Sequence, residues 1–232
     1  MRGRRARHHG GMELSDVMRS TPAVRDFTDD PVPDDVLFRI LDNARFAPSG
    51  GNRQGVRVIV VRDQDTRSAL AELARPAARR YAAQLAAGES PWNPLHPPAA
   101  DPSTIDATEA PPAMWTTLRD APVVLVFTVD LGVVAATDQD LNRIAVVPGA
   151  SVYPLVWNVL LAARDEGYGG VPTTMVIAEE PRAKELLGIP DQYALAAFVP
   201  LGKPVRQVTK LKRRSVDEFV TRERFDGAPF TG

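Results

Sequence analysis

The chain contains 232 residues, with 28 basic and 29 acidic side chains, 44% hydrophobic residues and no cysteine. This length predicts one globular domain or two small ones. The balanced charge argues against a nucleic-acid-binding protein, which normally carries a basic excess. The lack of cysteine excludes disulfides, thiolate zinc sites, iron–sulfur ligation and a catalytic thiol, and it fits a cytoplasmic location. No apolar window reaches the ~18–20 residues of a membrane-spanning helix.

Histidine is scarce as well, with His8, His9 and His96 as its three occurrences. The first two lie in an arginine-rich stretch ahead of Met12. We interpret residues 1–11 as a disordered extension, vector-derived residues or residues ahead of the true start. A single remaining histidine argues against a zinc-binding helix or a Ser-His-Asp triad, and we expect no metal site. If the protein is an enzyme, a cofactor supplies its chemistry.

The first half of the chain alternates helical and extended patterns. Apolar spacing predicts a short helix over 13–19, ended before Pro22, and a second helix from Asp34 or Asp35 to Ala44. The β-branched run 56–61 is typical of a buried strand. A further helix is predicted from about residue 66, with an interruption at Pro76.

The second half begins with a proline-rich excursion, which we assign to about residues 88–118 and which contains Trp92 and Trp115. A loop of this length is usually functional or disordered, so it is either a lid over a ligand or a loose surface loop anchored by tryptophan. The later patterns predict strands over 123–129, 173–177 and 194–201, helices over 150–166 and 182–187, and an amphipathic segment over 216–220. This order indicates an α/β or α+β fold with one sheet.

Two common nucleotide-binding motifs are absent. The glycine cluster at 167–170 has Pro172 where the dinucleotide fingerprint needs its third glycine, and the cluster follows a helix instead of a strand. No Walker phosphate loop is present. Three other segments, 19–25, 48–54 and 210–214, combine cations, hydroxyls and glycines that suit phosphate binding. Each segment alone is also typical of an ordinary turn or a solvated charged face.

Together, these segments resemble the FMN-dependent nitroreductase family from about Met12 to Val220. The resemblance is carried by Val24-Arg25-Asp26-Phe27 and by Ala47-Pro48-Ser49-Gly50-Gly51-Asn52-Arg53-Gln54, which contains the family's APS-x-x-N-x-Q signature in full. Asn158, the segment 171–174 and the ending 213–218 support it. The resemblance implies an α+β fold for a single domain over 12–232. It would be a three-layer sandwich with one mixed central sheet flanked by helices, forming an intertwined homodimer with FMN at each subunit junction.

The same resemblance assigns roles to individual residues. The flavin contacts it implies are Arg19, Ser20, Arg25, Pro48, Ser49, Gly50, Asn52, Gln54, Pro172, Thr173, Thr174, Lys212, Arg213 and Arg214. Thr173 and Thr174 would support flavin N5, and no side chain is expected to act as a catalytic acid or base. Tyr81, Trp92 and Trp115 are predicted to contact the substrate.

The sequence departs from the family pattern at two places. Thr21-Pro22-Ala23 stands where a basic or serine-rich run is common, so Arg19, Ser20 or the tail would supply phosphate contacts. Gly55-Val56 follows Gln54 where a tryptophan is frequent, which leaves more room near the cofactor.

The implied activity is hydride transfer from NADH or NADPH to a nitroaromatic, a quinone or a similar flat electrophile by a ping-pong mechanism. The alternatives are reductive dehalogenation, enone reduction or flavin fragmentation on the same fold, and flavin storage without turnover. The expected partners are a second copy of the chain and a small-molecule electron acceptor. We expect no membrane partner and no nucleic acid, although residues 2–7 and 210–214 are basic.

Overall fold

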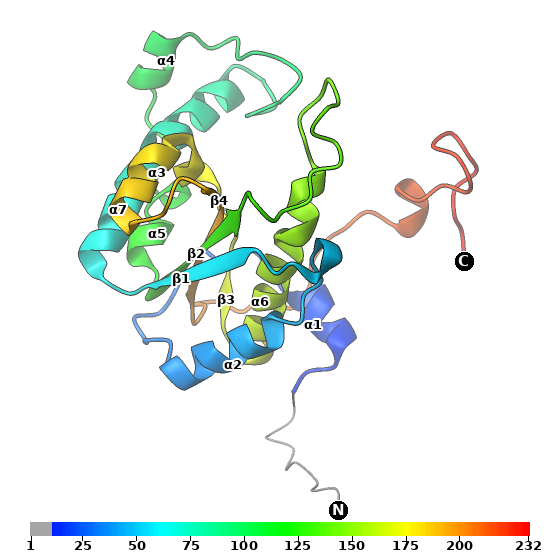
Figure 1. Cartoon of the computed structure of the whole chain (residues 1–232), viewed down its shortest axis with the longest axis horizontal. Coiled ribbons are helices and arrows are strands. Elements are labelled where there is room, and N and C mark those ends of the chain that lie inside the picture. Colours follow the sequence, from blue (N-terminus) through cyan, green and yellow to red (C-terminus); the bar gives the residue numbers. More distant parts are fainter. Residues whose placement is uncertain (1–10) are drawn as a thin grey trace, which may run out of the picture.

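The computed structural model describes residues 11–232, so the expectation for the N-terminal extension lies outside it except at Gly11. A four-stranded sheet in the order β1-β2-β4-β3 forms the centre (Figure 1). Its strands are β1 (Val56–Val61), β2 (Val123–Asp130), β3 (Gly169–Gly170) and β4 (Tyr193–Gly202). All paired strands are antiparallel. Within residues 11–232 the mixed character that we expected is limited to one isolated parallel bridge between Ala23 and Gly170.

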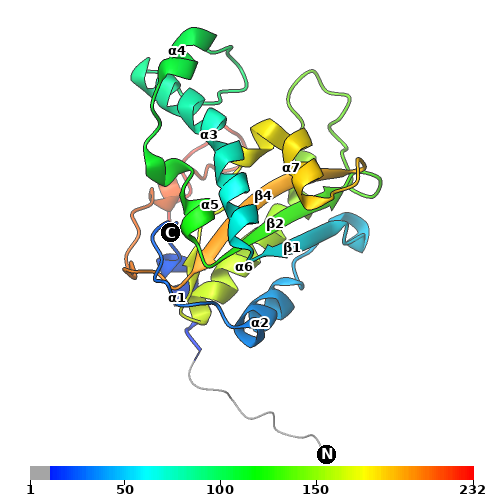
Figure 2. The same cartoon turned by 90° about the vertical axis from the view of Figure 1, so that its left-hand side faces the viewer.

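Strand β2 is buried on both faces and therefore contributes to two cores. Leu125 and Phe127 pack with α2 (Asp34–Ala44) and α6 (Tyr153–Asp165). Val124 and Val126 pack with α3 (Gln64–Ala86), α5 (Thr117–Asp120) and α7 (Glu180–Leu187). Figure 2 shows α3 and α7 covering one side of the sheet. The three-layer α+β arrangement is thus confirmed, because alternate residues of one strand face opposite helix layers.

The remaining elements are short. The α-helices are α1 (Leu14–Ser20) and α4 (Pro102–Ala107). The 3₁₀ helices are η1 (Gly50–Asn52), η2 (Pro112–Met114), η3 (Val147–Ser151), η4 (Met175–Glu179) and η5 (Val216–Glu218). The proline-rich excursion is therefore built partly from α4 and η2.

Two predicted elements were wrong. Helix α3 runs through Pro76 without interruption. Pro76 is exposed, whereas Ala74, Ala77 and Ala78 are buried, so packing outweighs the ~3 kcal/mol that an interior proline costs. The expected strand over 173–177 contains only a bridge between Thr173 and Phe198, and the chain then turns into η4, which buries Val176 against the α3 side of the sheet.

The two-residue strand β3 was not predicted, because the glycines at 169 and 170 were interpreted only as a helix end. A Cβ on Gly170 would lie 2.5 Å from the backbone oxygen of Pro200. Glycine is therefore needed at this position so that the chain can approach β4 closely enough to pair with it.

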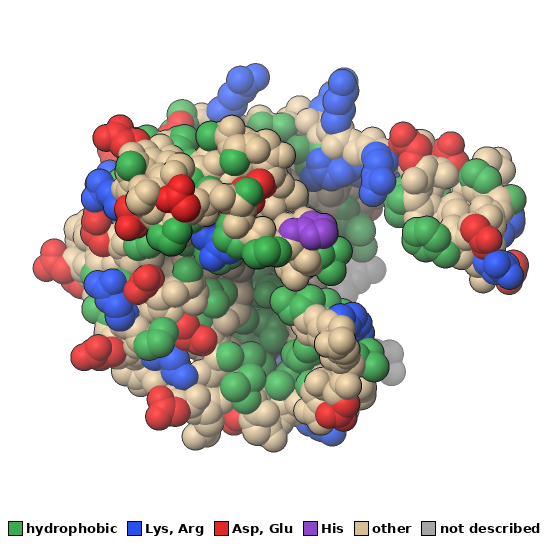
Figure 3. All heavy atoms as spheres, turned by 90° about the horizontal axis from the view of Figure 1, so that it is seen from above, with side chains coloured by type: hydrophobic (Ala, Val, Ile, Leu, Met, Phe, Trp, Pro, Cys, Tyr) green, Lys and Arg blue, Asp and Glu red, His purple; other side chains and the backbone are tan. Residues whose placement is uncertain are grey.

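The C-terminal segment 203–232, which we call the arm, begins against the body, where Pro204 pairs with Phe27, and its last part projects away from the body (Figure 1). Phe219, Phe225 and Phe230 are large apolar side chains exposed on it. Viewed from above, hydrophobic side chains also line the hollowed face beside the arm (Figure 3). None of the helices described in residues 11–232 is long and apolar enough to cross a membrane.

Candidate functional site

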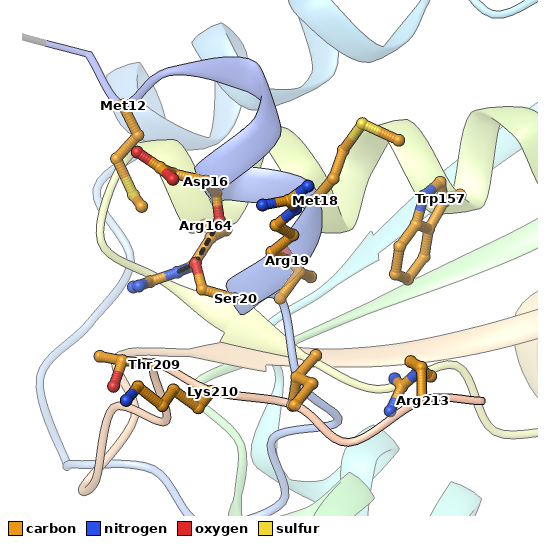
Figure 4. Close-up of a pocket in the computed structure, with 12 residues that line it drawn as sticks. Met12, Asp16, Met18, Arg19, Ser20, Trp157, Arg164, Thr209, Lys210 and Arg213 are labelled. Atoms are coloured by element: carbon orange, nitrogen blue, oxygen red, sulfur yellow. Dashed lines mark hydrogen bonds between the residues drawn. The ribbon is translucent and has the colours of Figure 1, made fainter. Parts of the chain in front are cut away.

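A cationic cavity of about 880 Å³ lies between α1, α6 and the start of the arm. Arg19 and Ser20 come from the end of α1, Arg164 from the last turn of α6, and Lys210 and Arg213 from the arm. Figure 4 shows Arg164 beside Ser20 at one end, and Trp157 and Arg213 at the other. Four cations against one lining carboxylate, that of Asp16, make this cavity suited to a phosphate group.

A second cavity of about 360 Å³, the threonine cavity, is lined by Arg25, Tyr81, Trp115, Thr173 and Thr174 among others. The extended segment after Thr21, which lines the cationic cavity, leads to Arg25. This segment is fixed at Val24, whose N–H donates to the oxygen of Gly170 at 3.0 Å. The two cavities therefore follow one another along the same stretch of chain.

Only one of the two threonine amides is free to bind a ligand. The Thr173 N–H donates to the Phe198 oxygen at 2.8 Å, and the Thr173 oxygen accepts from the Phe198 N–H at 2.9 Å. The Thr174 N–H has no acceptor among residues 11–232. A hydrogen bond from the backbone toward a flavin N5 would thus come from Thr174, while Thr173 holds the segment on β4.

The lid cavity, of about 630 Å³, adjoins the threonine cavity and shares Tyr81 and Thr174 with it. Trp92 also lines it. Each lid tryptophan is covered by an arginine of α3: the Arg80 guanidinium lies 4.0 Å from the Trp92 ring centre, and that of Arg75 lies 5.2 Å from the Trp115 ring centre. These cation–π contacts anchor the lid onto α3.

Glu89 organises the start of the lid. Its carboxylate accepts hydrogen bonds from Gln84 Nε2 at 2.9 Å and from the N–H groups of Ala99 and Ala100 at 2.9 and 3.1 Å. The hydrogen bond from Gln84, followed by those from the two amides, lowers the pKa of Glu89. Gln84 is buried, and its Oε1 accepts from the Trp92 N–H at 3.2 Å. These hydrogen bonds tie the start of the proline-rich segment to α3, and its role as a lid over a ligand stays a prediction.

The signature loop 48–54 has a strained, internally bonded backbone. Ser49 Oγ accepts from the Gln54 N–H at 3.0 Å, and the Gly50 N–H donates to Ser151 Oγ at 3.0 Å. Asn52 and Gln54 have φ values of 53° and 50°, in the left-handed region. Such a conformation costs about 1–3 kcal/mol for a non-glycine residue and is typical of ligand-binding loops.

The structure brings some predicted site residues together and separates others. Arg19, Ser20 and Arg213 line the cationic cavity, whereas Arg25, Pro172, Thr173 and Thr174 line the threonine cavity. Pro48, Ser49 and Gln54 line a separate cavity of about 160 Å³ with Ser151, and Gly50 contacts that serine. Lys212, Arg214 and Asn52 line none of these cavities.

Arg164 and Lys210 line the cationic cavity but were not among the predicted site residues. Arg164 follows Val156 and Leu160 at helical spacing, and all three are buried. A charged residue at an apolar position of a helix is unusual, and this feature of the sequence could have identified Arg164 as a candidate site residue. Lys210 belongs to the basic run 210–214, but only the folded arm shows which of its cations turn toward α1. No group of three or more His, Asp or Glu side chains in residues 11–232 is arranged to hold a metal.

Comparisons with known proteins identify relatives of this chain. An NADH dehydrogenase of Thermus thermophilus is 30% identical over 200 residues, covering 80% of this chain and 83% of the relative. A nitrobenzene nitroreductase of Ectopseudomonas oleovorans is 26% identical, covering 90% and 96%. An iodotyrosine deiodinase of Nematostella vectensis is 26% identical, covering 90% and 74%.

A solved structure of an iodotyrosine deiodinase bound to FMN and 3-iodo-L-tyrosine shares the fold, with a TM-score of 0.62 at 22% identity over 91% of this chain and 99% of that one. The model of the Nitroreductase family matches residues 18–203, which include the end of α1, all four strands and both threonines of the threonine cavity. The chain therefore belongs to the nitroreductase family.

Proposed function

We propose that this protein is an FMN-dependent oxidoreductase that takes hydride from NADH or NADPH and passes electrons to a flat electrophile by a ping-pong mechanism. Two observations carry the proposal: the segment after Thr21 leads from the cationic cavity to Arg25 at the threonine cavity, and the threonine and lid cavities share Tyr81 and Thr174. The cationic cavity suits the phosphate of FMN, the threonine cavity suits its polar planar ring, and the lid cavity suits an aromatic acceptor.

The residues present fit FMN in their chemistry. The cationic cavity suits its phosphate monoester. Arg25 lines the threonine cavity, and its side chain has no hydrogen-bond or ion-pair partner within residues 11–232. When bound, FMN supplies hydride transfer. Arg25 would stabilise negative charge at the flavin's pyrimidine end, and the Thr174 N–H would donate toward N5. The lid would exclude water from the acceptor position beside Trp92.

We further propose that the working site requires two copies of the chain. The signature loop 48–54 lines neither the cationic nor the threonine cavity of its own protomer. The projecting arm exposes Phe219, Phe225 and Phe230, and the α1–α6 face exposes Met18 and Trp157. Apolar surface of this kind is typical of an interface. A second copy would cover it and place its loop 48–54 against this protomer's cavities.

The relatives support particular acceptors. The name of the nitrobenzene nitroreductase supports a nitroaromatic, and that of the NADH dehydrogenase supports a nicotinamide donor. The similarity to an iodotyrosine deiodinase supports reductive dehalogenation as a second candidate reaction. Trp92 and Trp115, each in a cation–π contact with an arginine, suit a planar aromatic acceptor for either reaction.

The test is to purify the protein, measure its flavin absorbance and molecular mass, and follow NADH and NADPH oxidation with a nitroaromatic, a quinone and an iodophenol. We expect a yellow dimer that oxidises a nicotinamide and reduces at least one acceptor. A colourless protein that does not bind added FMN would refute the proposal. Tight FMN binding without reduction by either nicotinamide would instead indicate storage.

A further inference from the structure

Arg164 is a buried arginine whose guanidinium is only partly used by the fold. The residue is 9% exposed, and its Nε donates to Ser20 Oγ at 3.1 Å. The Ser20 hydroxyl in turn donates to the Asp16 backbone oxygen at 2.6 Å (Figure 4). The two terminal nitrogens of Arg164 make no hydrogen bond within residues 11–232, and the residue lines the cationic cavity. Arg164 is thus held at one nitrogen with its other donors left for a ligand.

Burying a cation without a counter-charge is costly. Across residues 11–232, no carboxylate forms an ion pair with Arg164. The Asp16 carboxylate lines the same cavity without pairing, and Asp165 accepts a hydrogen bond from the Met12 N–H at 2.7 Å. The unpaired charge of Arg164 at the cavity wall suits an anion bound from outside the chain.

The neighbouring segment cannot provide an equivalent donor. The Thr21 hydroxyl donates to the Val17 oxygen at 2.7 Å, Pro22 has no N–H, and Ala23 has no polar side chain. The other cations of the cavity, Arg19 and Lys210 among them, are exposed. Arg164 differs from them because burial and Ser20 fix its orientation, and a fixed guanidinium presents parallel donors that match a phosphate.

We propose that Arg164 is a phosphate-binding residue of the flavin site, and that it supplies from α6 the fixed cation missing from the segment 21–23. This inference rests on the proposed FMN function and adds to it a specific contact, which predicts discrimination between FMN and riboflavin. The two flavins share the ring and the ribityl chain and differ by the phosphate.

The test measures the dissociation constants of FMN and riboflavin for the apoprotein by quenching of flavin fluorescence. Arg164→Gln should weaken FMN binding roughly 10- to 100-fold, the range expected for charge-assisted hydrogen bonds, and should leave riboflavin binding almost unchanged. Arg164→Lys should recover part of the loss because the charge is kept. Arg182→Gln on α7, whose side chain is exposed, is the matched control and should change neither constant.

Thermal unfolding of the apoprotein separates ligand binding from a purely structural tie between α1 and α6. Because Arg164 has no ion pair and the Ser20 hydroxyl keeps its bond to the Asp16 oxygen, Arg164→Met should not lower the unfolding temperature of the apoprotein. An equal loss of affinity for FMN and riboflavin, together with a lower unfolding temperature, would overturn the proposal. So would an unchanged preference for FMN in Arg164→Gln, while the proposed function would stand. Wild-type protein that binds neither flavin would refute both.

Discussion

Replacing Arg25 by alanine tests the ring end of the proposed flavin site. The side chain is exposed and makes no hydrogen bond or ion pair within residues 11–232. The backbone around it is fixed independently, because the Val24 N–H donates to Gly170 and the Thr28 N–H donates to the Lys203 oxygen at 2.9 Å. The substitution should therefore change the free energy of unfolding of the apoprotein by no more than about 0.5 kcal/mol.

The substitution should instead weaken flavin binding. Loss of one charge-assisted hydrogen bond is worth about 1.5–3 kcal/mol, which raises the dissociation constant of FMN roughly 10- to 150-fold. Riboflavin should lose affinity by a similar factor, because Arg25 lines the threonine cavity and not the cationic one. The midpoint potential should also become more negative, by about 30 mV for each 1.4 kcal/mol of lost preference for the reduced form.

Fluorescence titration and redox-dye equilibration measure these two quantities, with thermal unfolding as the control for folding. An FMN dissociation constant within about threefold of wild type, well below the loss of one charge-assisted bond, would remove Arg25 from the site.

The other predictions concern the lid and the sheet. Trp92→Ala and Trp115→Ala should change the ratio of kcat/KM between acceptors more than the affinity for FMN; identical ratios across a nitroaromatic, a quinone and an iodophenol would show that the lid does not select substrates. Because the folded pKa of Glu89 is lowered, its stabilisation of the lid should be complete above the ordinary carboxyl pKa of about 4.3 and lost as the pH falls below it. Proteolysis within 88–101 should accelerate over that acidic range in wild type, but show no such pH step in Glu89→Gln. Gly170→Ala places a Cβ 2.5 Å from the Pro200 oxygen and should lower the unfolding free energy by about 1–3 kcal/mol, measured by urea denaturation; unchanged stability would mean that β3 moves freely.

The strands and long helices were predictable because their apolar periodicity reflects burial directly. The run 56–61 coincides with β1, and the buried residues of α2 follow the helical pattern that predicted it. Pro76 misled the prediction, since its local cost is offset by alanines buried on the opposite side of α3, a tertiary effect that a local pattern does not contain. Strand β3 is two glycines long and carries no alternating pattern at all.

The site was predictable in its parts and less so in its grouping. Arg19, Ser20 and Arg213 lie around one cavity, and the phosphate contacts expected of them stay a prediction. The Thr173 N–H is used in the bridge to Phe198, whereas the Thr174 N–H is left for a ligand. No feature of the sequence identifies which of the two amides pairs with the strand. The partner-dependent position proposed for loop 48–54 likewise depends on a second chain.

The most direct test of the shared site is complementation between two defective variants. Arg25→Ala and Asn52→Asp chains carrying different tags would be co-expressed, and the heterodimer isolated by both tags. If each site combines Arg25 of one copy with loop 48–54 of the other, one site of the heterodimer is intact. The account predicts one tightly bound FMN per heterodimer and about half of the wild-type kcat, because one of two sites is restored. A heterodimer as defective as both parent homodimers would show that each site lies within one chain, and would contradict the account.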